Sequence, residues 1–438
     1  MAGQCWPSSV WSERIMDKLA KALAVYGDRR ILTVLLLGFS SGLPLALTGS
    51  TLALWLTEAK VSLATIGYFA LVGTPYIFKF AWAPLIDHVR LPLLTRLFGR
   101  RRAWMLATQT LLIAALLGLG FNDPAARPEL TALLAVVVAF CSASQDIVID
   151  AYRVEILDAE QYGAGAAAVQ AGYRIAMLTT GAGALYLAQF SGSWSLTYAV
   201  MAALVLVGMA TVLANAEPVA DLPPPPPGVT GWLRHAVADP FMDMARRQGW
   251  MILGVLAFIL LYKLGDAFAG VMANPFYVRM GFSKNEIASV SKVFGFTATL
   301  AGTFVGGVLV ARFGLFKSLL LCGVLQMGSN LMFAWQAVMG HDILALTLTI
   351  AVENFTGGLG SAAFVAYMSG LCSLSYTGTQ YALLSSLAAV GRTLIASTTG
   401  LLAERLGWVD FFLLSTLVAV PGLLLLLWMM RKARVEPG

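Results

Sequence analysis

The chain has 438 residues, of which 58% are hydrophobic and 12% are charged, and its mean hydropathy is +0.77. No soluble domain of this length has that composition, so a multi-pass membrane protein is expected. A net charge of +6 would suit nucleic-acid binding in a soluble protein, but basic loops are ordinary at the cytoplasmic face of a membrane protein, and no nucleic-acid partner is expected. The four cysteines form no CxxC pair and the three histidines lie far apart, so the sequence indicates no redox centre, metal site or cofactor.

Residues 1–30 are predicted to form a cytoplasmic amphipathic segment. Trp11, Ile15, Leu19 and Leu23 recur at every fourth position with basic residues between them, which is the pattern of a helix lying on a membrane surface. A frayed tail is the alternative. No apolar core of the right length precedes a small-residue cleavage site here, so no cleavable signal peptide is expected.

Twelve apolar runs of membrane-spanning length follow, in two sets of six. They lie at about 31–57, 61–86, 103–121, 130–155, 163–190 and 196–214, and then at about 249–277, 284–310, 316–338, 343–371, 378–402 and 409–430. The sequence therefore predicts an all-α membrane protein with an N-terminal six-helix bundle at 31–214, a C-terminal six-helix bundle at 249–430 and a cytoplasmic tail at 431–438. Residues 215–248 contain five consecutive prolines and are predicted to be a stiff, Pro-rich cytoplasmic linker.

The distribution of basic residues predicts that both termini are cytoplasmic. If the N-terminus lies inside, the inner loops hold the Lys and Arg residues of 14–30, 90–102, 234–247, 312–317 and 431–434. The outer loops hold only Lys60, Arg127, Arg279, Lys284 and Arg405. This excess of positive charge on one side sets the expected orientation.

The loop after the second predicted span has a more specific pattern. Twelve spans divided by a central linker describe the major facilitator architecture. The residues Asp87-His88 and Gly99-Arg100-Arg101-Arg102 resemble that superfamily's loop pattern, with His88 in place of the usual Arg. Such a loop can pair with helix ends and hold one conformation shut. The predicted conformational latch comprises Asp87, Arg100, Arg101, Arg102 and Arg153; a loop that is merely basic is the alternative.

The fourth predicted span ends in the stretch SASQDIVIDAYRVEIL, residues 142–157. At about 100° per residue, Asp146, Asp150 and Arg153 fall on one helical face together with Ser142, whereas Glu155 points roughly the opposite way. A carboxylate facing lipid costs about 2.5–3.5 kcal/mol. This face is therefore expected to look into protein or into a watery cavity.

Further ionisable residues lie within the predicted spans: Lys79, Arg174, Lys263, Asp266, Lys292, Glu353 and Arg392. By residue count, Arg174, Lys263, Lys292 and Glu353 fall near the membrane midplane, too deep to be explained by snorkelling. Lys79 lies nearer the cytoplasmic end of its span, where a snorkelling structural lysine explains it as well as a ligand does. Lys263 and Asp266 are three residues apart and can simply neutralise each other.

These deep charges include more cations than anions, which suits an anionic solute because cationic side chains bind carboxylates. A buried carboxyl that takes up and releases a proton as access alternates would couple transport to a proton gradient. The candidates for that role are Asp146, Asp150, Asp266 and Glu353. The other polar candidates are Gln145, Asn354, Gln380 and Tyr173, although intramembrane polar side chains more often hold helices together than bind solutes.

A closer resemblance lies in several longer stretches. They include LGFSSGLPLALTGSTL (37–52), GRRRAWMLATQ (99–109), AFCSASQDIVIDAY (139–152), LYKLGDAFA (261–269) and QYALLSSLAAVGR (380–392). These stretches resemble the AmpG family of muropeptide permeases, over about residues 30–430. The resemblance implies a proton-driven importer of the bacterial inner membrane that carries N-acetylglucosaminyl-1,6-anhydro-N-acetylmuramyl peptides from periplasm to cytoplasm. The imported products would feed peptidoglycan recycling and signal β-lactamase induction, hence β-lactam resistance.

The resemblance also suggests roles for the candidate residues. The substrate's carboxylates would be held by Arg174, Lys263, Lys292 and Arg392, and its sugar and amide groups by Gln145, Asn354 and Gln380, with Lys79 and Tyr173 as further binding candidates. Protons and membrane lipids are the other expected partners, and the protein is expected to be a monomer.

Two observations leave alternatives open. Familiar enterobacterial members of the family carry further hydrophobic segments after the twelfth span, whereas this sequence stops shortly after Arg431-Lys432-Ala433-Arg434, so a different substrate range or a paralogue is possible. A permease for another large anion, such as an acyl-CoA or a siderophore, is a second hypothesis. A membrane enzyme or sensor is the third, but the sequence has no HExxH, no phosphate-cradling GxxxxGK[ST] and no soluble output domain.

Overall fold

The computed structural model describes residues 24–61, 69–218, 231, 234, 238–287, 289–290, 294–390 and 399–435. The helices of the first half are α2 (Arg29–Thr48), α3 (Ser50–Glu58), α5 (Thr74–Phe78), α6 (Ala83–His88), α7 (Leu94–Phe98), α8 (Arg100–Gly120), α9 (Pro128–Ile156), α10 (Tyr162–Leu178), α11 (Ala184–Ser191) and α12 (Trp194–Ala214). Those of the second half are α14 (Asp239–Gln248), α15 (Ile252–Leu261), α16 (Leu264–Arg279), α17 (Lys284–Ile287), α18 (Gly295–Phe313), α19 (Leu315–Met339), α20 (Ile343–Leu371), α21 (Thr377–Val390), α22 (Thr399–Leu406) and α23 (Trp408–Val435). The amphipathic helix expected near Trp11 lies outside the described residues.

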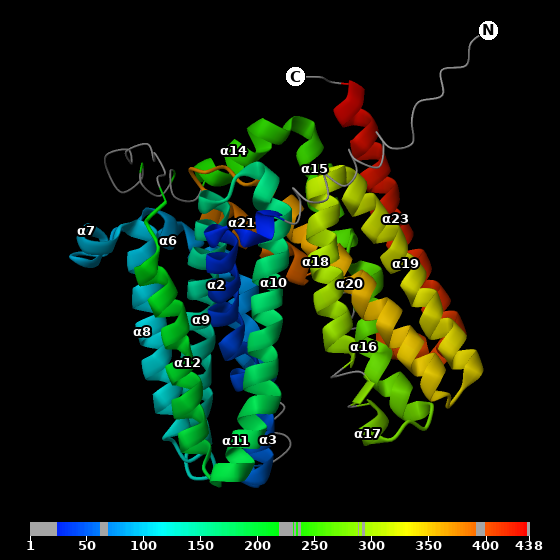
Figure 1. Cartoon of the computed structure of the whole chain (residues 1–438), viewed down its shortest axis with the longest axis horizontal. Coiled ribbons are helices and arrows are strands. Elements are labelled where there is room, and N and C mark those ends of the chain that lie inside the picture. The colour runs from blue at the N-terminus through cyan, green and yellow to red at the C-terminus, as the bar shows by residue number, and fades with distance from the viewer. Residues whose placement is uncertain are drawn as a thin grey trace.

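The described elements are all helical, and they gather into two bundles that stand side by side (Figure 1). Within the described ranges, nine helical runs are long and apolar enough to cross a membrane. The fifth predicted span is also one helical run, with a π-helical turn at Thr179–Gly183 between α10 and α11. The predicted span 61–86 contains α5 and α6 after the undescribed residues 62–68, and the predicted span 378–402 contains α21 and the start of α22 on either side of the undescribed residues 391–398.

Local sequence explains where several spans begin. The side chain of Ser193 accepts a hydrogen bond from the backbone N–H of Leu196 and starts α12, and Asp342 does the same for α20 through Ala345. Such caps satisfy backbone donors that a helix leaves unpaired. Gly314 has a φ of +78° and separates α18 from α19, because a glycine reaches this left-handed region without steric cost.

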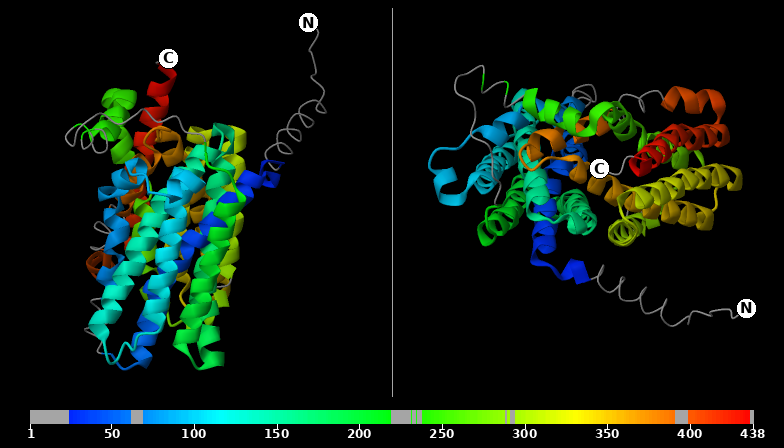
Figure 2. Two further views of the ribbon diagram at one scale, coloured as in Figure 1. Left: turned by 90° about the vertical axis from the view of Figure 1, so that its left-hand side faces the viewer. Right: turned by 90° about the horizontal axis from the view of Figure 1, so that it is seen from above.

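One end of the molecule carries the linker helix α14, and we call this the linker end. In both side views α14 lies across this end, which also holds the C-terminal end of α23 (Figure 1; Figure 2). The two bundles contact each other here and diverge towards the opposite end (Figure 1). Glycines permit part of this contact: a Cβ on Gly163 of α10 would lie 2.8 Å from the backbone oxygen of Gly307 in α18. The structure is therefore closed between the bundles at the linker end.

Within the first bundle, α2 and α10 cross at backbone contact. A Cβ on Gly172 would lie 2.0 Å from the carbonyl oxygen of Leu35 and 2.7 Å from the amide nitrogen of Phe39, and neither atom can move as a flexible side chain could. Small residues of this kind let membrane helices approach closely. Helix α2 continues through Gly42 and Pro44, and it is interrupted at Gly49, between α2 and α3.

We expect Gly172→Ala to destabilise the protein by about 1–3 kcal/mol or more, because the added methyl group overpacks this crossing. Gly270→Ala is the matched control, since nothing lies within 4 Å of a Cβ at that helical position. Thermal unfolding of both variants in detergent checks the prediction. Equal melting temperatures would show that α2 and α10 separate without cost.

Candidate functional site

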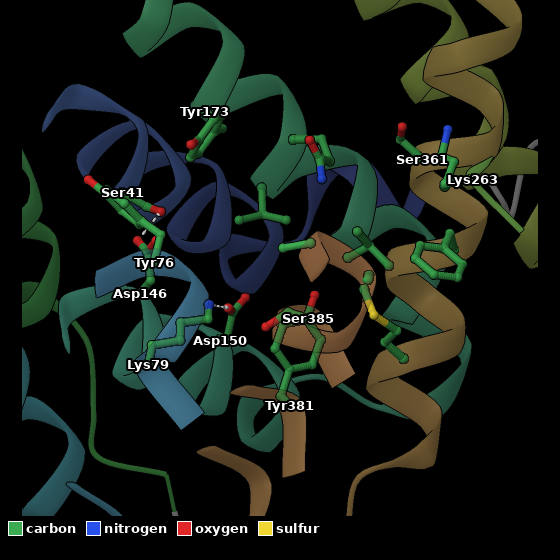
Figure 3. Close-up of a pocket in the computed structure, with 17 residues that line it drawn as sticks. Ser41, Tyr76, Lys79, Asp146, Asp150, Tyr173, Lys263, Ser361, Tyr381 and Ser385 are labelled. Carbon is green, nitrogen blue, oxygen red and sulfur yellow. Dashed lines mark hydrogen bonds and ion pairs between the residues drawn. The ribbon is translucent and has the colours of Figure 1, made fainter. Parts of the chain in front are cut away.

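A cavity of about 320 Å³ lies between the two halves (Figure 3). The first half contributes Lys79, Asp146, Asp150 and Tyr173 to its wall, together with Ser41, Tyr76, Val169 and Gln170. The second half contributes Lys263, Ser361, Tyr381 and Ser385, together with Phe364, Val365, Met368, Ala388 and Ala389. Both walls carry hydroxyl groups and one ammonium group each, but the two carboxylates belong to the first half, whereas the wall from the second half has more apolar residues.

Two carboxylates of α9 face this cavity from successive turns. The Ser41 hydroxyl of α2 donates a hydrogen bond of 2.6 Å to Oδ1 of Asp146. The Lys79 ammonium lies 3.6 Å from Oδ2 of Asp150, and Figure 3 shows this pair at the cavity edge. The placement agrees with the expectation that this face of the helix avoids lipid, since Lys79 is also buried.

Arg153, one turn further along α9, connects the halves. Its Nη2 lies 3.4 Å from Oδ1 of Asp150, and its Nη1 donates a 2.9 Å hydrogen bond to the Ser369 hydroxyl of α20. The guanidinium also stacks over the ring of Tyr381 at 5.1 Å, and its side chain is 1% exposed. Asp150 therefore neutralises two buried cations, Lys79 and Arg153.

A second polar cluster lies in the second half, where the seventh span breaks between α15 and α16. Lys263 stands at the break, and its Nζ lies 3.3 Å from Asp266, 3.1 Å from Oε1 of Gln326 and 3.5 Å from the carbonyl oxygen of Gly357. Broken membrane helices commonly place such groups near binding sites.

Glu353 of α20 belongs to the same cluster. It accepts a 2.8 Å hydrogen bond from the amide of Asn354, whose oxygen accepts a 2.9 Å bond from the Thr299 hydroxyl. Glu353 interacts electrostatically with Asp266, Lys263 and Arg174. The sequence placed these charges at similar depth, and the structure brings them together.

A third cluster, the Arg101 cluster, joins the bundles at the linker end. It consists of Asp87, Arg100, Arg101 and Glu155 from the first half and Thr377 and Thr379 from α21. The Arg101 guanidinium lies 2.6 Å from Asp87 and 2.5 Å from Glu155, and it donates a 2.8 Å hydrogen bond to the Thr377 hydroxyl.

The backbone N–H and the hydroxyl of Thr379 both donate to Asp87 at 2.6 Å. Asp87 follows the second span. Burial opposes its ionisation, but Arg101 and the Thr379 hydrogen bond hold its pKa below the ordinary value. The stabilisation that Asp87 provides is therefore present above the ordinary carboxyl pKa and is lost as the pH falls through the lowered one.

The remaining predicted residues lie elsewhere. Gln145 donates to the Ser40 hydroxyl between α9 and α2, and Gln380 donates to Pro240 and Asp243 of α14. Arg102 donates to the carbonyl oxygens of Val212 and Leu213. Arg174 lies in electrostatic range of Glu353, as described above, although it is exposed. The candidates Lys292 and Arg392 lie outside the described residues.

Sequence reasoning missed several wall residues, namely Ser41, Tyr76, Ser361, Tyr381 and Ser385 as ligand candidates, and it missed Glu155, Thr377 and Thr379 in the Arg101 cluster. Hydroxyl groups give no hydropathy signal that separates a cavity wall from a helix contact. Pairing across the bundles has no sequence signal at all.

The chain matches the Major Facilitator Superfamily over residues 34–282. It is 44% identical over 407 residues to the anhydromuropeptide permease of Escherichia coli (strain K12). The aligned region covers 92% of this chain and 80% of that permease. The chain belongs to the AmpG family of the major facilitator superfamily. Another member, putative transporter AmpG 4 of Rickettsia conorii, is 35% identical over 413 residues, covering 94% of this chain and 99% of that one.

Solved structures agree with this family's fold. The proton:xylose symporter XylE has a TM-score of 0.66 at 15% identity, covering 92% of this chain and 94% of its own. The human organic anion transporter MFSD10 has a TM-score of 0.61 at 17% identity, and the match covers 91% of this chain and 99% of that transporter. The predicted architecture of twelve helices in two six-helix bundles is confirmed, and an AmpG-family protein is a multi-pass membrane transporter and not an enzyme.

One sequence motif that is typical of hydrolases also occurs in this chain. Residues 38–42 read Gly-Phe-Ser-Ser-Gly, which matches the GxSxG pattern of hydrolase nucleophiles. That chemistry requires a sharp strand-to-helix turn that exposes the serine. Here the five residues lie inside α2 and Ser40 is fully buried, so the match has no catalytic meaning.

Proposed function

We propose that this protein imports anhydromuropeptides, that is, GlcNAc-1,6-anhydroMurNAc with or without attached peptide, by alternating access. The cavity between the halves carries the proposal, because its walls hold carboxylates and hydroxyls together with the Lys263 ammonium, which lies on the opposite side from the Lys79–Asp150 pair. Sugar hydroxyls donate to carboxylates such as Asp146, and a peptide carboxylate binds an ammonium such as Lys263. The 44% identity to an anhydromuropeptide permease supports this substrate class.

Protons drive the import in this proposal. The cavity and its adjoining cluster hold four carboxylates within the spans, Asp146, Asp150, Asp266 and Glu353. Intramembrane carboxyl groups that alternate between the two sides are the usual carriers of a coupled proton. Import would supply peptidoglycan recycling and the signal for β-lactamase induction.

The same proposal gives the Arg101 cluster the role of a conformational latch. Asp87 and Arg101 hold α21 through Thr379 and Thr377, and Arg100 supports Asp87 by donating to its backbone oxygen. Arg153 adds a second contact between the bundles through Ser369. Arg102 positions the loop against the end of α12. Substrate entry from the opposite end is compatible with this closed arrangement.

We further propose that the linker end faces the cytoplasm of the bacterial inner membrane, with both termini inside. The basic loops of the first half, including Arg90, Arg96 and Arg100, support this orientation. Residues 31–214 and 249–430 would be the two bundles, joined by the linker at 215–248, and the protein would work as a lipid-embedded monomer.

The test is uptake of labelled GlcNAc-1,6-anhydroMurNAc-tripeptide into proteoliposomes. We expect accumulation when the lumen is alkaline relative to the outside, and loss of accumulation when a protonophore is added. Protein-free liposomes control for leakage. Absence of uptake by correctly inserted protein would exclude this substrate and favour another large anion, such as an acyl-CoA or a siderophore.

A further inference from the structure

Lys263 belongs to two sites at once. It lines the central cavity, and Figure 3 shows it on the far side from Lys79 and Asp150. Its ammonium is also the cation closest to Asp266, at 3.3 Å, among the ion pairs of the described residues. A substrate anion in the cavity and Asp266 therefore compete for one ammonium group.

The cluster around Lys263 is balanced in charge only while that ammonium stays in it. Asp266 lies 3.3 Å from the Lys263 ammonium, and Glu353 lies one helical turn before Gly357 of α20, whose carbonyl oxygen is 3.5 Å from the same ammonium. Glu353 is in electrostatic range of Asp266 and of the cations Lys263 and Arg174. The uncharged titratable groups in range, within the described residues, are Tyr277, facing Glu353, Tyr262, facing Asp266, and Cys322, facing Lys263. Two carboxylates thus face two cations in the described part of the chain.

Arg174 differs from the other members because it comes from α10, in the opposite half. Its interaction with Glu353 crosses the boundary between the bundles and therefore changes when the bundles rock. If Lys263 is engaged by a substrate anion, this guanidinium from the opposite bundle is the one cation in the described part of the chain that still faces Glu353. Two carboxylates close together in a low-dielectric site share a proton rather than remain both ionised.

The surroundings leave Lys263 able to change partners. Gln326 accepts from it, and the amide nitrogen of Gln326 is buried with no hydrogen-bond partner among the described residues. A side chain at position 360 would meet this group, because a Cβ on Gly360 would lie 2.5 Å from Oε1 of Gln326 and 3.4 Å from the Lys263 ammonium. Of the three partners that the described residues give the Lys263 ammonium, Gln326 and the Gly357 carbonyl are uncharged, so the ammonium leaves one charged partner, Asp266, when it moves.

We propose that Lys263 is the residue that links the substrate to the proton, and that the Asp266–Glu353 pair is where the proton binds. In the empty protein the ammonium neutralises Asp266. An anionic group of the substrate draws the ammonium towards the cavity, and the carboxylate pair then takes one proton from the side to which the site is open. When the substrate leaves, the ammonium returns to Asp266 and the proton is released. The inference rests on the proposed import of an anionic muropeptide.

Thermodynamic linkage between substrate binding and proton binding allows this mechanism to be tested in the purified protein. If substrate binding promotes proton binding, a lower pH must strengthen substrate binding by the same factor. Adding the tripeptide-bearing anhydromuropeptide to wild-type protein in weak buffer should therefore cause net proton uptake, read with a pH-sensitive dye. The same ligand with its carboxyl groups methyl-esterified should cause none, because it has no anion to attract Lys263.

The variants Glu353→Gln and Asp266→Asn should bind the ligand without proton uptake, and the binding constant should lose its pH dependence. Lys263→Gln should weaken binding at every pH, and Lys263→Arg should restore both binding and proton uptake in part. Glu286→Gln is the matched control, since Glu286 lies in α17, is bonded to Ser283 and does not line the cavity. Two substitutions in the pair keep the test usable if one variant does not fold.

The outcomes separate the two proposals. If the wild type does not bind the muropeptide, the proposed function fails, and this inference fails with it. If it binds and Glu353→Gln and Asp266→Asn still take up protons as the wild type does, only the coupling inference is overturned. Loss of proton uptake in Asp146→Asn alone would overturn it equally, and would move the proton to the opposite wall of the cavity.

Discussion

Replacing Arg101 by Leu should destabilise the protein by about 3–5 kcal/mol, because it leaves two buried carboxylates without the guanidinium they share. The side chains of Arg101, Asp87 and Glu155 are each no more than 1% exposed, so water does not replace the lost charge while the linker end is closed. Opening that end hydrates both carboxylates. The substitution is therefore expected to shift the protein towards conformations in which α21 has moved away from the first half.

Spin labels at Leu97 of α7 and Leu374, just before α21, can measure this shift, because both side chains are exposed at the linker end. In a background without the four native cysteines, double electron–electron resonance should show a longer distance between the two spin labels in Arg101→Leu than in the parent. Arg90→Leu, which removes an exposed arginine from the same loop, is the control. Reduced stability with an unchanged distance would mean that the cluster is structural and does not hold a conformation.

The spans and the acidic face of α9 were predictable because each depends on residues close together in the chain. Span length follows from the local run of apolar residues. Asp146 and Asp150 share a helical face by spacing alone, and both line the cavity. The depth of Lys263 followed from counting along its span, which is why its place in the wall could be anticipated.

Partners of the polar groups were not predictable, because they depend on how the spans are rotated and packed. Glu155 points away from Asp150 on the helix, yet this direction leads to Arg101 and Thr377. Arg101 and Thr377 are 276 residues apart. Gln380 has the polarity expected of a ligand, but its neighbour in space is α14, in the linker.

The linker sequence contains a helix signal that the sequence prediction did not use. The prediction was a stiff polar connection, and within it the structure places helix α14 at Asp239–Gln248. Pro240 lies in the first turn, and Arg246 and Arg247 lie in the last, which are favoured positions for proline and for cations in a helix. The five consecutive prolines lie outside the described residues.

The second large effect is expected for Asp150→Leu, which removes the carboxylate that neutralises two buried cations. Lys79 keeps no other ion pair among the described residues, and Arg153 keeps only the Ser369 hydroxyl and the Tyr381 ring. We expect a loss of about 3–5 kcal/mol of stability and loss of muropeptide uptake, since both charges line or adjoin the cavity. Thermal unfolding in detergent and proteoliposome uptake measure the two effects.

A double-mutant cycle distinguishes the lost pairing from a general loss of packing. Lys79→Met removes the cation that Asp150→Leu leaves unpaired, so the double variant should be more stable than the sum of the two single effects predicts. The exposed pair Arg30–Asp158 is the control, because its side chains are 50% and 70% exposed, and such pairs contribute less than about 1 kcal/mol. If the effects at Lys79 and Asp150 simply add, the 3.6 Å contact between them contributes nothing to folding, and Arg153 alone accounts for the cost of losing Asp150.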